Sequence, residues 1–566
     1  MSDQPLSSEA RFEKFIAVLI ALTSIFIAGT AYLEHRASGN SYRFEREAQL
    51  LSIQSTTENI NGALRFSYDW QGAFQTWREL DLMITNAEQL GETDRAALYR
   101  AVLEEIRPFS PLLASPYFDP NFNWPDPYSY EAELYVIESA RLQEQFESKS
   151  MVSNTWDQIA NNFVLQITLY AVALSFFGLS TTIHSVMRWV FVLLGGLIIL
   201  VNLGGSVLIL YVPVDEIPVD AIDSYAHGVG LAYQGHHDEA IDAFRDAIVS
   251  YSALPGNPSY TNAYYNKAIS NLAIGEYEAA VGDFEATMLG GRVDTTVLWN
   301  LGWSYYMLGR FGESVAVNQQ ALAMNPTLVG LRLNQGLNML AQGRFENAVE
   351  EYRLAVEEAE RQIAEARATG QAVPPSLWYF MEAGVFDIQS LIDQAAGSPK
   401  SWTQAPAPHL LNVDLDRLQT TGTSEIVRLK EYIVSLEFFG TVPRPPTGRS
   451  VSEFAFVREI RDENGNFIDY EDATVNEFGT NAVGVLIDFT GFQNGEHLLW
   501  KVYVNGYEDP VLRSVDDWHS GESGSGVKWF SYAFSNVFVF TPGEYTVELY
   551  IDTRLMQTGI FTVLPP

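Results

Sequence analysis

G-E-Y-E-A-A at residues 275–280 returns as G-R-F-G-E-S at 309–314 and as G-R-F-E-N-A at 343–348. Each of these copies begins 34 residues after the one before it. A further copy begins at Gly235, 40 residues before the first of them, and a loop at 253–258 that contains proline and glycine accounts for the extra length. A fixed period in this range is typical of a helical repeat array, in which each unit is a pair of packed helices.

Small residues recur around each of these glycines at the positions that a helix pair needs. A glycine or alanine stands seven residues before each turn glycine, where two antiparallel helices cross and only a small side chain lets them approach. The turn glycine supplies the left-handed backbone that ends the first helix. The small residues are Gly228, Ala268, Gly302 and Gly336. Ser314, Asn318 and His237 depart from the pattern in single copies and leave the period intact.

The third copy resembles the tetratricopeptide repeat family most fully. The matching residues are Leu301, Gly302, Tyr305, Gly309, Phe311, Ala321 and Pro326. The resemblance implies an α-helical solenoid of four repeats whose concave surface holds peptides or other proteins. It places the array at 222–396, with a linker at 364–375 and a capping helix at 376–396 that closes the last repeat.

Five residues on the first helices of the repeats are candidates for contacts with a protein partner in this groove. They are Tyr265, Asn266, Asn300, Tyr306 and Asn334. Asparagine carries both donors and an acceptor, so it can clamp the backbone of a bound peptide. An exposed polar helix residue without a binding role is the other interpretation of each of them.

The last part of the chain changes from helical to alternating patterns. Residues 397–424 contain several Pro, Ser and Thr and are expected to be a linker, and 425–566 to be an all-β domain. Strong turn signals, three Asn-Gly pairs and one Pro-Gly pair, separate runs of strand-forming residues. The final run, G-E-Y-T-V-E-L-Y-I-D at 543–552, resembles the closing hairpin of bacterial immunoglobulin-like sandwiches. Such domains bind proteins or sugars, or act as spacers.

Two features of this domain raise the question of a ligand. Trp518 and Trp529 are candidate contacts for a small ligand or a glycan, and a place in the sandwich core is the other interpretation. Asp462, Asn464 and Asn466 have an oxygen-ligand spacing for calcium, which a hairpin turn explains better. We expect neither a metal nor a cofactor.

Three stretches are long and apolar enough to cross a bilayer, which takes about 20 residues. After a tail at 1–14, they run over 15–33, 163–183 and 186–212. Because no acidic or basic residue lies well inside any of them, we expect membrane anchors rather than an ion or proton pathway.

The distribution of basic residues predicts an orientation. Residues 189–244 contain no Lys or Arg, so the positive-inside rule places the end of the third stretch outside the cytoplasm. Three crossings then leave the amino terminus inside, and the soluble bulk lies outside the plasma membrane. Arg36, Arg43 and Arg46, which follow the first stretch, argue for the opposite orientation.

Residues 34–162, between the first two apolar stretches, are expected to form an extramembrane helical domain. Apolar residues recur at helical spacing over 45–78 and 93–106, and a further helix is expected over 131–148. An aromatic loop lies between the last two helices. Its residues Tyr117, Phe118, Phe122 and Trp124 either rim a ligand pocket or pin the loop to its own domain.

The composition argues against several classes of function. Lys and Arg number 34 against 70 Asp and Glu, and a formal net charge of −36 repels the phosphates of nucleic acids. The absence of cysteine excludes disulfides and thiol chemistry and fits a prokaryotic envelope protein. No H-E-x-x-H, G-x-S-x-G or phosphate-loop motif occurs in a fitting context, so we do not expect an enzyme.

Together these patterns predict a multidomain α + β membrane protein with transmembrane helices, a tetratricopeptide-repeat solenoid and an all-β immunoglobulin-like sandwich. The predicted function is a scaffold or adaptor, held in the lipid bilayer at the cell envelope, that gathers proteins in the repeat groove. The alternative is an envelope receptor or sensor that binds a small ligand or a glycan through the helical loop or the sandwich.

Overall fold

The computed structural model describes residues 8–119, 124–183, 185–252, 259–397, 413–439, 448–461, 467–519, 521–531 and 539–565. The chain divides into two compact units, Met1–Arg292 and Val293–Pro566, which we call the amino-terminal and carboxy-terminal units. Three sequence-based predictions lie outside the described residues: the loop at 253–258, nearly all of the linker before 413, and the calcium-like turn at 462–466.

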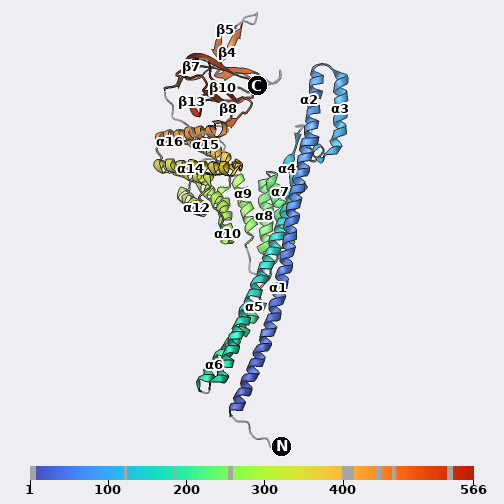
Figure 1. Cartoon of the computed structure of the whole chain (residues 1–566). Helices are drawn as coiled ribbons and strands as arrows, with labels where there is room; N and C mark the ends of the chain where they lie inside the picture. Colours follow the sequence, from blue (N-terminus) through green and yellow to red (C-terminus); the bar gives the residue numbers. More distant parts are fainter. Residues whose placement is uncertain are drawn as a thin grey trace, which may run out of the picture. The chain divides into compact units, whose positions relative to one another are not determined.

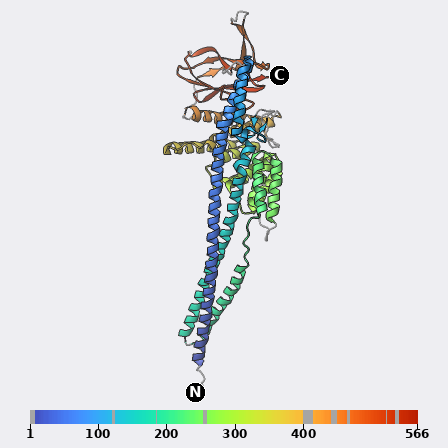
Figure 2. The same cartoon turned by 90° about the vertical axis from the view of Figure 1, so that its right-hand side faces the viewer.

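Two long antiparallel helices, α1 (Ser8–Tyr68) and α5 (Ile137–Thr182), lie side by side in the amino-terminal unit (Figures 1 and 2). Small residues of α1 spaced seven apart face α5: Ser41, Ala48, Ser55 and Gly62. The hydroxyl of Ser55 donates to the carbonyl of Ser139 at 3.0 Å, and a Cβ on Gly62 would lie 2.2 Å from Tyr135. The two helices can therefore approach closely along their whole contact.

Within the described residues, three helices are long and apolar enough to cross a membrane, by length and composition. The predicted stretches 15–33 and 163–183 lie in α1 and α5, and 186–212 forms most of α6 (Met187–Leu210). Polar groups join α5 to α6: the amide of Asn202 donates to the carbonyl of Gln166 at 2.9 Å. Such hydrogen bonds between apolar helices help to hold a helical hairpin together in lipid.

The far end of α1 carries a small helical subdomain, built from η1 (Asp69–Phe74), α2 (Gln75–Gln89), α3 (Thr93–Ile106), η2 (Arg107–Phe109), η3 (Pro111–Leu113), β1 (Phe118–Asp119), β2 (Trp124–Pro125), α4 (Pro127–Glu131) and η4 (Ala132–Val136). Helix α3 begins and ends at the predicted residues. Phe118 is buried edge-on against Trp77, at 5.0 Å between ring centroids, and the ring of Trp124 contacts Phe74 at 5.1 Å. These loop aromatics pin the loop to its own domain; Phe122 lies outside the described residues.

The repeats form helix pairs of the predicted kind. They are α7 (Val219–Tyr233) with α8 (His237–Ser252), α9 (Thr261–Ala273) with α10 (Tyr277–Leu289), α11 (Thr295–Met307) with α12 (Phe311–Met324), and α13 (Val329–Ala341) with α14 (Phe345–Thr369). The turn glycines have φ of 81°, 83°, 73° and 70°, the left-handed region that glycine tolerates. A Cβ on Gly228 would lie 2.8 Å from Phe244, so the small residue lets the two helices of the first pair cross closely.

Two predictions about the helices that follow the repeats are wrong. Helix α14 continues through the predicted linker as far as Thr369, because ion pairs such as Arg361–Glu365 at i, i+4 support the extra turns. Residues 415–434, predicted as the end of a linker and the start of the all-β domain, form α16 (Leu415–Val434). The Asp414 side chain caps α16, and its apolar residues fall at helical spacing. Helix α15 (Pro375–Ala395) lies between α14 and α16 in the sequence. The short helix η5 (Ser435–Phe439) follows α16 and precedes the strands of the β-rich region.

The β-rich region begins at Ser450 rather than at 425. Its strands are β3 (Ser450–Val451), β4 (Ala455–Arg461), β5 (Phe467–Asp472), β6 (Val475–Asn476), β7 (Ala482–Thr490), β8 (His497–Val504), β9 (Tyr507–Glu508), β10 (Ser514–Asp517), β11 (Ser523–Ser531), β12 (Gly543–Ile551) and β13 (Arg554–Val563). One sheet has the order β10-β8-β12-β13-β6 and the other β11-β7-β4-β5. Inward residues of both sheets, among them Val485 and Val547, share one hydrophobic core.

A buried ionic cluster joins α16 and η5 to the outer face of the β8–β12 sheet. Lys501 on β8 is 2 % exposed, and its ammonium group donates to Glu508 at 2.9 Å and to Glu437 of η5 at 3.2 Å. Lys430 of α16 pairs with Glu548 on β12, which is 1 % exposed. Helix α16 and η5 are therefore joined to the β-rich region by ion pairs as well as by apolar contacts.

Candidate protein-binding site

The first helix of each repeat packs on its second helix along the side that carries the small residue. We call the neighbouring side, which carries the residue three positions before each small residue, the inner face: Tyr225, Tyr265, Trp299 and Leu333. This is the face on which the sequence places the protein-binding groove. Tyr225 and Tyr265 also contact Phe244 and Phe284 of their own second helices, at 5.7 and 6.0 Å between ring centroids. In both units, helices from other parts of the chain pack against the first helices.

In the amino-terminal unit, α5 runs antiparallel to α7 and holds the repeats on the α1–α5 pair. The guanidinium of Arg141 donates to Asp223 at 2.8 Å, and Lys149 bonds Glu216 at 3.0 Å. A Cβ on Gly230 would lie 2.4 Å from Ile137, so the two helices are also in close contact beyond the Arg141–Asp223 pair. Figure 1 shows α7 and α8 alongside the upper part of this pair.

The centre of this contact is a buried carboxylate, Glu144 of α5. Glu144 is 1 % exposed and accepts hydrogen bonds at 2.8 Å from the hydroxyl of Tyr260 and at 2.8 Å from the amide of Asn262, at the start of α9. Burial raises the pKa of Glu144 above its ordinary value, and the two hydrogen bonds oppose the rise. The carboxylate therefore ties α5 to the second repeat at an electrostatic cost.

Both predicted groove residues of this unit take part in internal contacts. The amide of Asn266 donates to the hydroxyl of Tyr225 at 2.7 Å, which joins α9 to α7. The guanidinium of Arg292 lies 4.1 Å from the ring centre of Tyr265, a cation–π contact. Tyr265 and Asn266 are both half-buried. Asn266 thus helps to hold the repeats together, and Tyr265 keeps part of its surface open to solvent.

In the carboxy-terminal unit, α15 lies against α11 and α13. Phe380 of α15 contacts the ring of Trp299 at 5.1 Å, and a Cβ on Gly384 would lie 3.1 Å from Leu333. The helix predicted at 376–396 as the cap of the array is therefore present as α15, and it covers part of the inner face. Phe380 and Gly384 allow α15 to pack on both α11 and α13. Helix α16 packs on α14 and α15.

The predicted groove residues of this unit have different surroundings. Tyr306 is 3 % exposed, its ring is stacked on Trp303 at 5.2 Å, and burial raises its pKa. Its prediction as a groove residue is corrected: it is a core residue between α11 and α12, because its ring also contacts Phe311 at 5.8 Å. Asn300 and Asn334 are half-buried on the same two first helices.

Two carboxyl groups near the repeats were missed by the sequence reasoning. Glu144 lies on the helix face formed by Ile137, Arg141 and Ser148, a spacing of three and four that indicates a buried side of α5. Asp387 of α15 is half-buried, and burial raises its pKa to about 7. No feature of the sequence around Asp387 sets it apart.

The two tryptophans proposed as ligand contacts pack within the β-rich region. The indole nitrogen of Trp518 donates to the carbonyl of Gly521 at 2.7 Å, and its ring meets Phe489 edge-on at 4.6 Å. Trp529 is half-buried over Gly484, where a Cβ would lie 2.9 Å from its ring. Within the described ranges, no group of three or more His, Asp or Glu could hold a metal ion.

The tetratricopeptide repeat family model matches residues 225–292 and 300–363 of this chain. The helix pairs α7 to α14 are therefore tetratricopeptide repeats. A search among curated proteins found no match.

Solved structures with similar repeats cover part of the chain. A crystal structure of MamA is 19 % identical and covers 26 % of this chain and 81 % of its own, with a TM-score of 0.24. MamA from Desulfovibrio magneticus RS-1 is 21 % identical over 25 % of this chain and 77 % of its own, with a TM-score of 0.24. YrrB is described as a TPR protein with an unusual peptide-binding site. It is 16 % identical and covers 30 % of this chain and 86 % of its own, with a TM-score of 0.23. Scores this low support no inference about function.

Proposed function

We propose that this chain is a membrane-anchored scaffold that binds other proteins through its tetratricopeptide repeats. The observation that carries the proposal is the repeat array, matched by the family model over both of its halves. Repeat solenoids of this kind offer extended surfaces for proteins or peptides. Internal contacts support each part of the array: Glu144 fixes the second repeat to the α1–α5 pair in the amino-terminal unit, and Lys501 fixes the β-rich region to the helices that follow the repeats in the carboxy-terminal unit.

The contact surface for a partner is the part of the inner face that α5 and α15 leave half-exposed. In the amino-terminal unit this part carries Tyr265 with its Arg292, and in the carboxy-terminal unit it carries Asn300 and Asn334. Aromatic, guanidinium and amide groups are the ones that commonly recognise peptide backbones and side chains.

The three apolar helices support a place in the plasma membrane, where they act as anchors. Their hydropathy and length suit a bilayer core. The absence of basic residues from 189 to 244 favours the orientation in which the repeats and the β-rich region lie outside the cytoplasm, at the cell envelope.

The β-rich region is proposed to be an immunoglobulin-like sandwich that acts as a spacer or as a second binding surface. The hydroxyl of Tyr545, near the start of β12, donates to the carbonyl of Thr541 at 2.9 Å, which is the geometry of the tyrosine corner of such domains. The order β8-β12-β13 and the order β11-β7-β4 correspond to the C-F-G and E-B-A strands of that fold. Among the described residues, the aromatic side chains behind the receptor alternative, such as Phe118, Trp124 and Trp518, contact other rings of their own domains.

Site-specific photo-crosslinking tests the proposal. A photoreactive side chain is placed at Asn300 or at Tyr265 in the full chain, in the membranes of cells that make it, and at Asp246, an exposed position on α8, as the matched control. We expect discrete adducts with other proteins from Asn300 or Tyr265 that Asp246 does not give. Failure of both inner-face positions, or the same adducts from all three, would mean that the inner face does not bind partners.

A further inference from the structure

A helix usually turns its large apolar residues towards the helix it packs on. Beyond the apolar stretch, α1 shows the opposite arrangement. Small residues face α5, whereas large apolar residues face away from it. Leu50, Ile53, Ile60 and Leu64 are 52 %, 63 %, 54 % and 65 % exposed. Exposed Thr57 lies between them, and we call these five residues the α1 stripe. Each buried leucine or isoleucine contributes about 1.5–3 kcal/mol, so four such side chains in water represent a large unused stabilisation.

The α1 stripe has the spacing of a coiled-coil seam. Its members follow one another at intervals of three, four, three and four residues, which are the a and d positions of a heptad. Leucine or threonine stands at each a position and isoleucine at each d position. A seam of this kind is completed by another helix with the same pattern, because knobs from each helix fit the holes of its partner.

The flanks of the α1 stripe carry no charge. The flanking e and g positions are Gln49, Gln54, Thr56, Asn61 and Ala63. Two copies of a chain with a net charge of −36 repel each other over most of their surface, but the flanks of the α1 stripe add no like-charge pair between two parallel helices. The α1 stripe and its flanks therefore suit a second copy of the same chain better than a charged partner.

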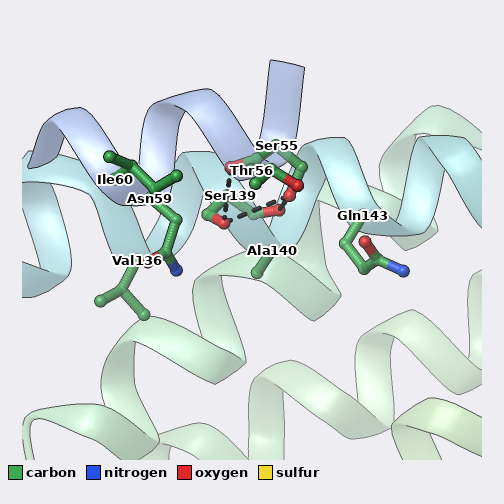
Figure 3. Close-up of a pocket in the computed structure, with 8 residues that line it drawn as sticks. All are labelled: Ser55, Thr56, Asn59, Ile60, Val136, Ser139, Ala140 and Gln143. Carbon is green, nitrogen blue, oxygen red and sulfur yellow. Dashed lines mark hydrogen bonds between the residues drawn. The ribbon is translucent and has the colours of Figure 1, made fainter. Parts of the chain in front are cut away.

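A groove borders the α1 stripe on each side, and neither groove contains the stripe. A groove of about 470 Å³ between α1 and α5 has Ile60 at its edge, and Figure 3 shows Asn59, Ser139 and Gln143 lining it with polar groups. The groove on the other flank, near Leu50, has charged residues, Lys149 and Glu216, beside apolar ones such as Leu51 and Ile222. The stripe lies between the two grooves, on the side of α1 that faces away from α5.

We propose that the α1 stripe binds the α1 stripe of a second copy of this chain in a parallel coiled coil. If the apolar part of α1 crosses the membrane, two copies in one bilayer present their stripes in the same direction and at the same height. Anchoring then raises the effective concentration of one stripe near the other. Leucine at a with isoleucine at d favours coiled coils of more than two strands. Further copies can therefore join the first two in the same assembly.

Single-cysteine crosslinking in membranes tests this proposal, since the chain has no cysteine and any disulfide must join two molecules. Ile53→Cys and Ile60→Cys place the thiol in the seam. Arg65→Cys, exposed on the same helix at a b position, is the control. Mild oxidation should give at least about ten-fold more disulfide-linked dimer from the seam positions, because a b position points away from the partner helix.

Equal crosslinking at all three positions, or none at the seam, would overturn the proposal. An adduct of a different mass would show that another protein covers the stripe, and would overturn it too. A second measurement does not depend on thiols: Ile53→Glu with Ile60→Glu changes only exposed side chains, so the chain should still fold. Light scattering of the detergent-solubilised full chain should give the mass of several chains for the natural sequence and of one for the double variant; a single-chain mass for both would contradict the seam.

Discussion

Lys501→Ala is expected to lower the free energy of unfolding of the carboxy-terminal unit by about 3 kcal/mol. Removal of one partner of a buried ion pair typically costs about 3–5 kcal/mol, because the remaining charge stays buried without compensation. The lower end of the range applies here, since Arg513 still reaches Glu437 at 3.3 Å and Glu508 at 3.4 Å. Thermal or urea unfolding of the full chain, followed by tryptophan fluorescence, measures the change.

Two variants divide this effect into its parts. Lys501→Met keeps the apolar stem and removes the charge, so the difference between the methionine and alanine variants reports the packing of the stem. Lys528→Ala breaks an exposed pair with Asp516 on β10 and should cost less than about 1 kcal/mol. Equal losses from Lys501→Ala and Lys528→Ala would contradict a stabilising role for the buried cluster.

Glu144→Ala is expected to loosen the repeats from the α1–α5 pair by about 2–5 kcal/mol. The substitution leaves the hydroxyl of Tyr260 and the amide of Asn262 without their acceptor, and each unsatisfied buried group costs about 1–3 kcal/mol. Hydrogen exchange of the amides in α7 and α9, measured on the full chain, should become faster. Glu144→Gln should stay within about 1 kcal/mol of the natural chain, since its carbonyl still accepts from Asn262 and its amide can donate to Tyr260.

The pH dependence of this contact follows from the raised pKa of Glu144. The folded chain binds the proton of this carboxyl more tightly than the unfolded chain, so its contribution to stability grows as the pH falls from neutrality towards the ordinary carboxyl range. The protonated acid resembles glutamine, so the difference in exchange between the natural chain and Glu144→Gln should shrink over the same pH interval. A difference that stays constant would show that Glu144 does not titrate in this contact.

The local features of the fold could be predicted from the sequence because they depend on nearby residues. The turn glycines and the small residues seven positions before them define each helix pair, and both have the predicted backbone and contacts. Helix α3 was predicted at its observed bounds, since its apolar spacing is a local signal.

The remaining features depend on contacts between distant segments. Glu144 and Tyr260 are 116 positions apart, and no periodicity indicates that they meet. Tyr306 has the position of a groove residue but is buried, because its ring packs between Trp303 and Phe311. The Thr- and Gly-containing start of α16 obscures its Asp414 cap and its helical spacing, and the helix is buried against α14, α15 and the β13 strand.

The proposed function depends most on the membrane anchor and on the side of the membrane where the repeats lie. One cysteine at Ser259, an exposed position at the start of the second repeat, can be labelled in intact cells with a membrane-impermeant maleimide, since the chain has no other thiol. We predict that the label reacts in intact cells and that the chain stays in the membrane pellet after alkaline carbonate extraction. A chain released into the soluble fraction would contradict the anchor, and a thiol that reacts only after lysis would place the scaffold in the cytoplasm.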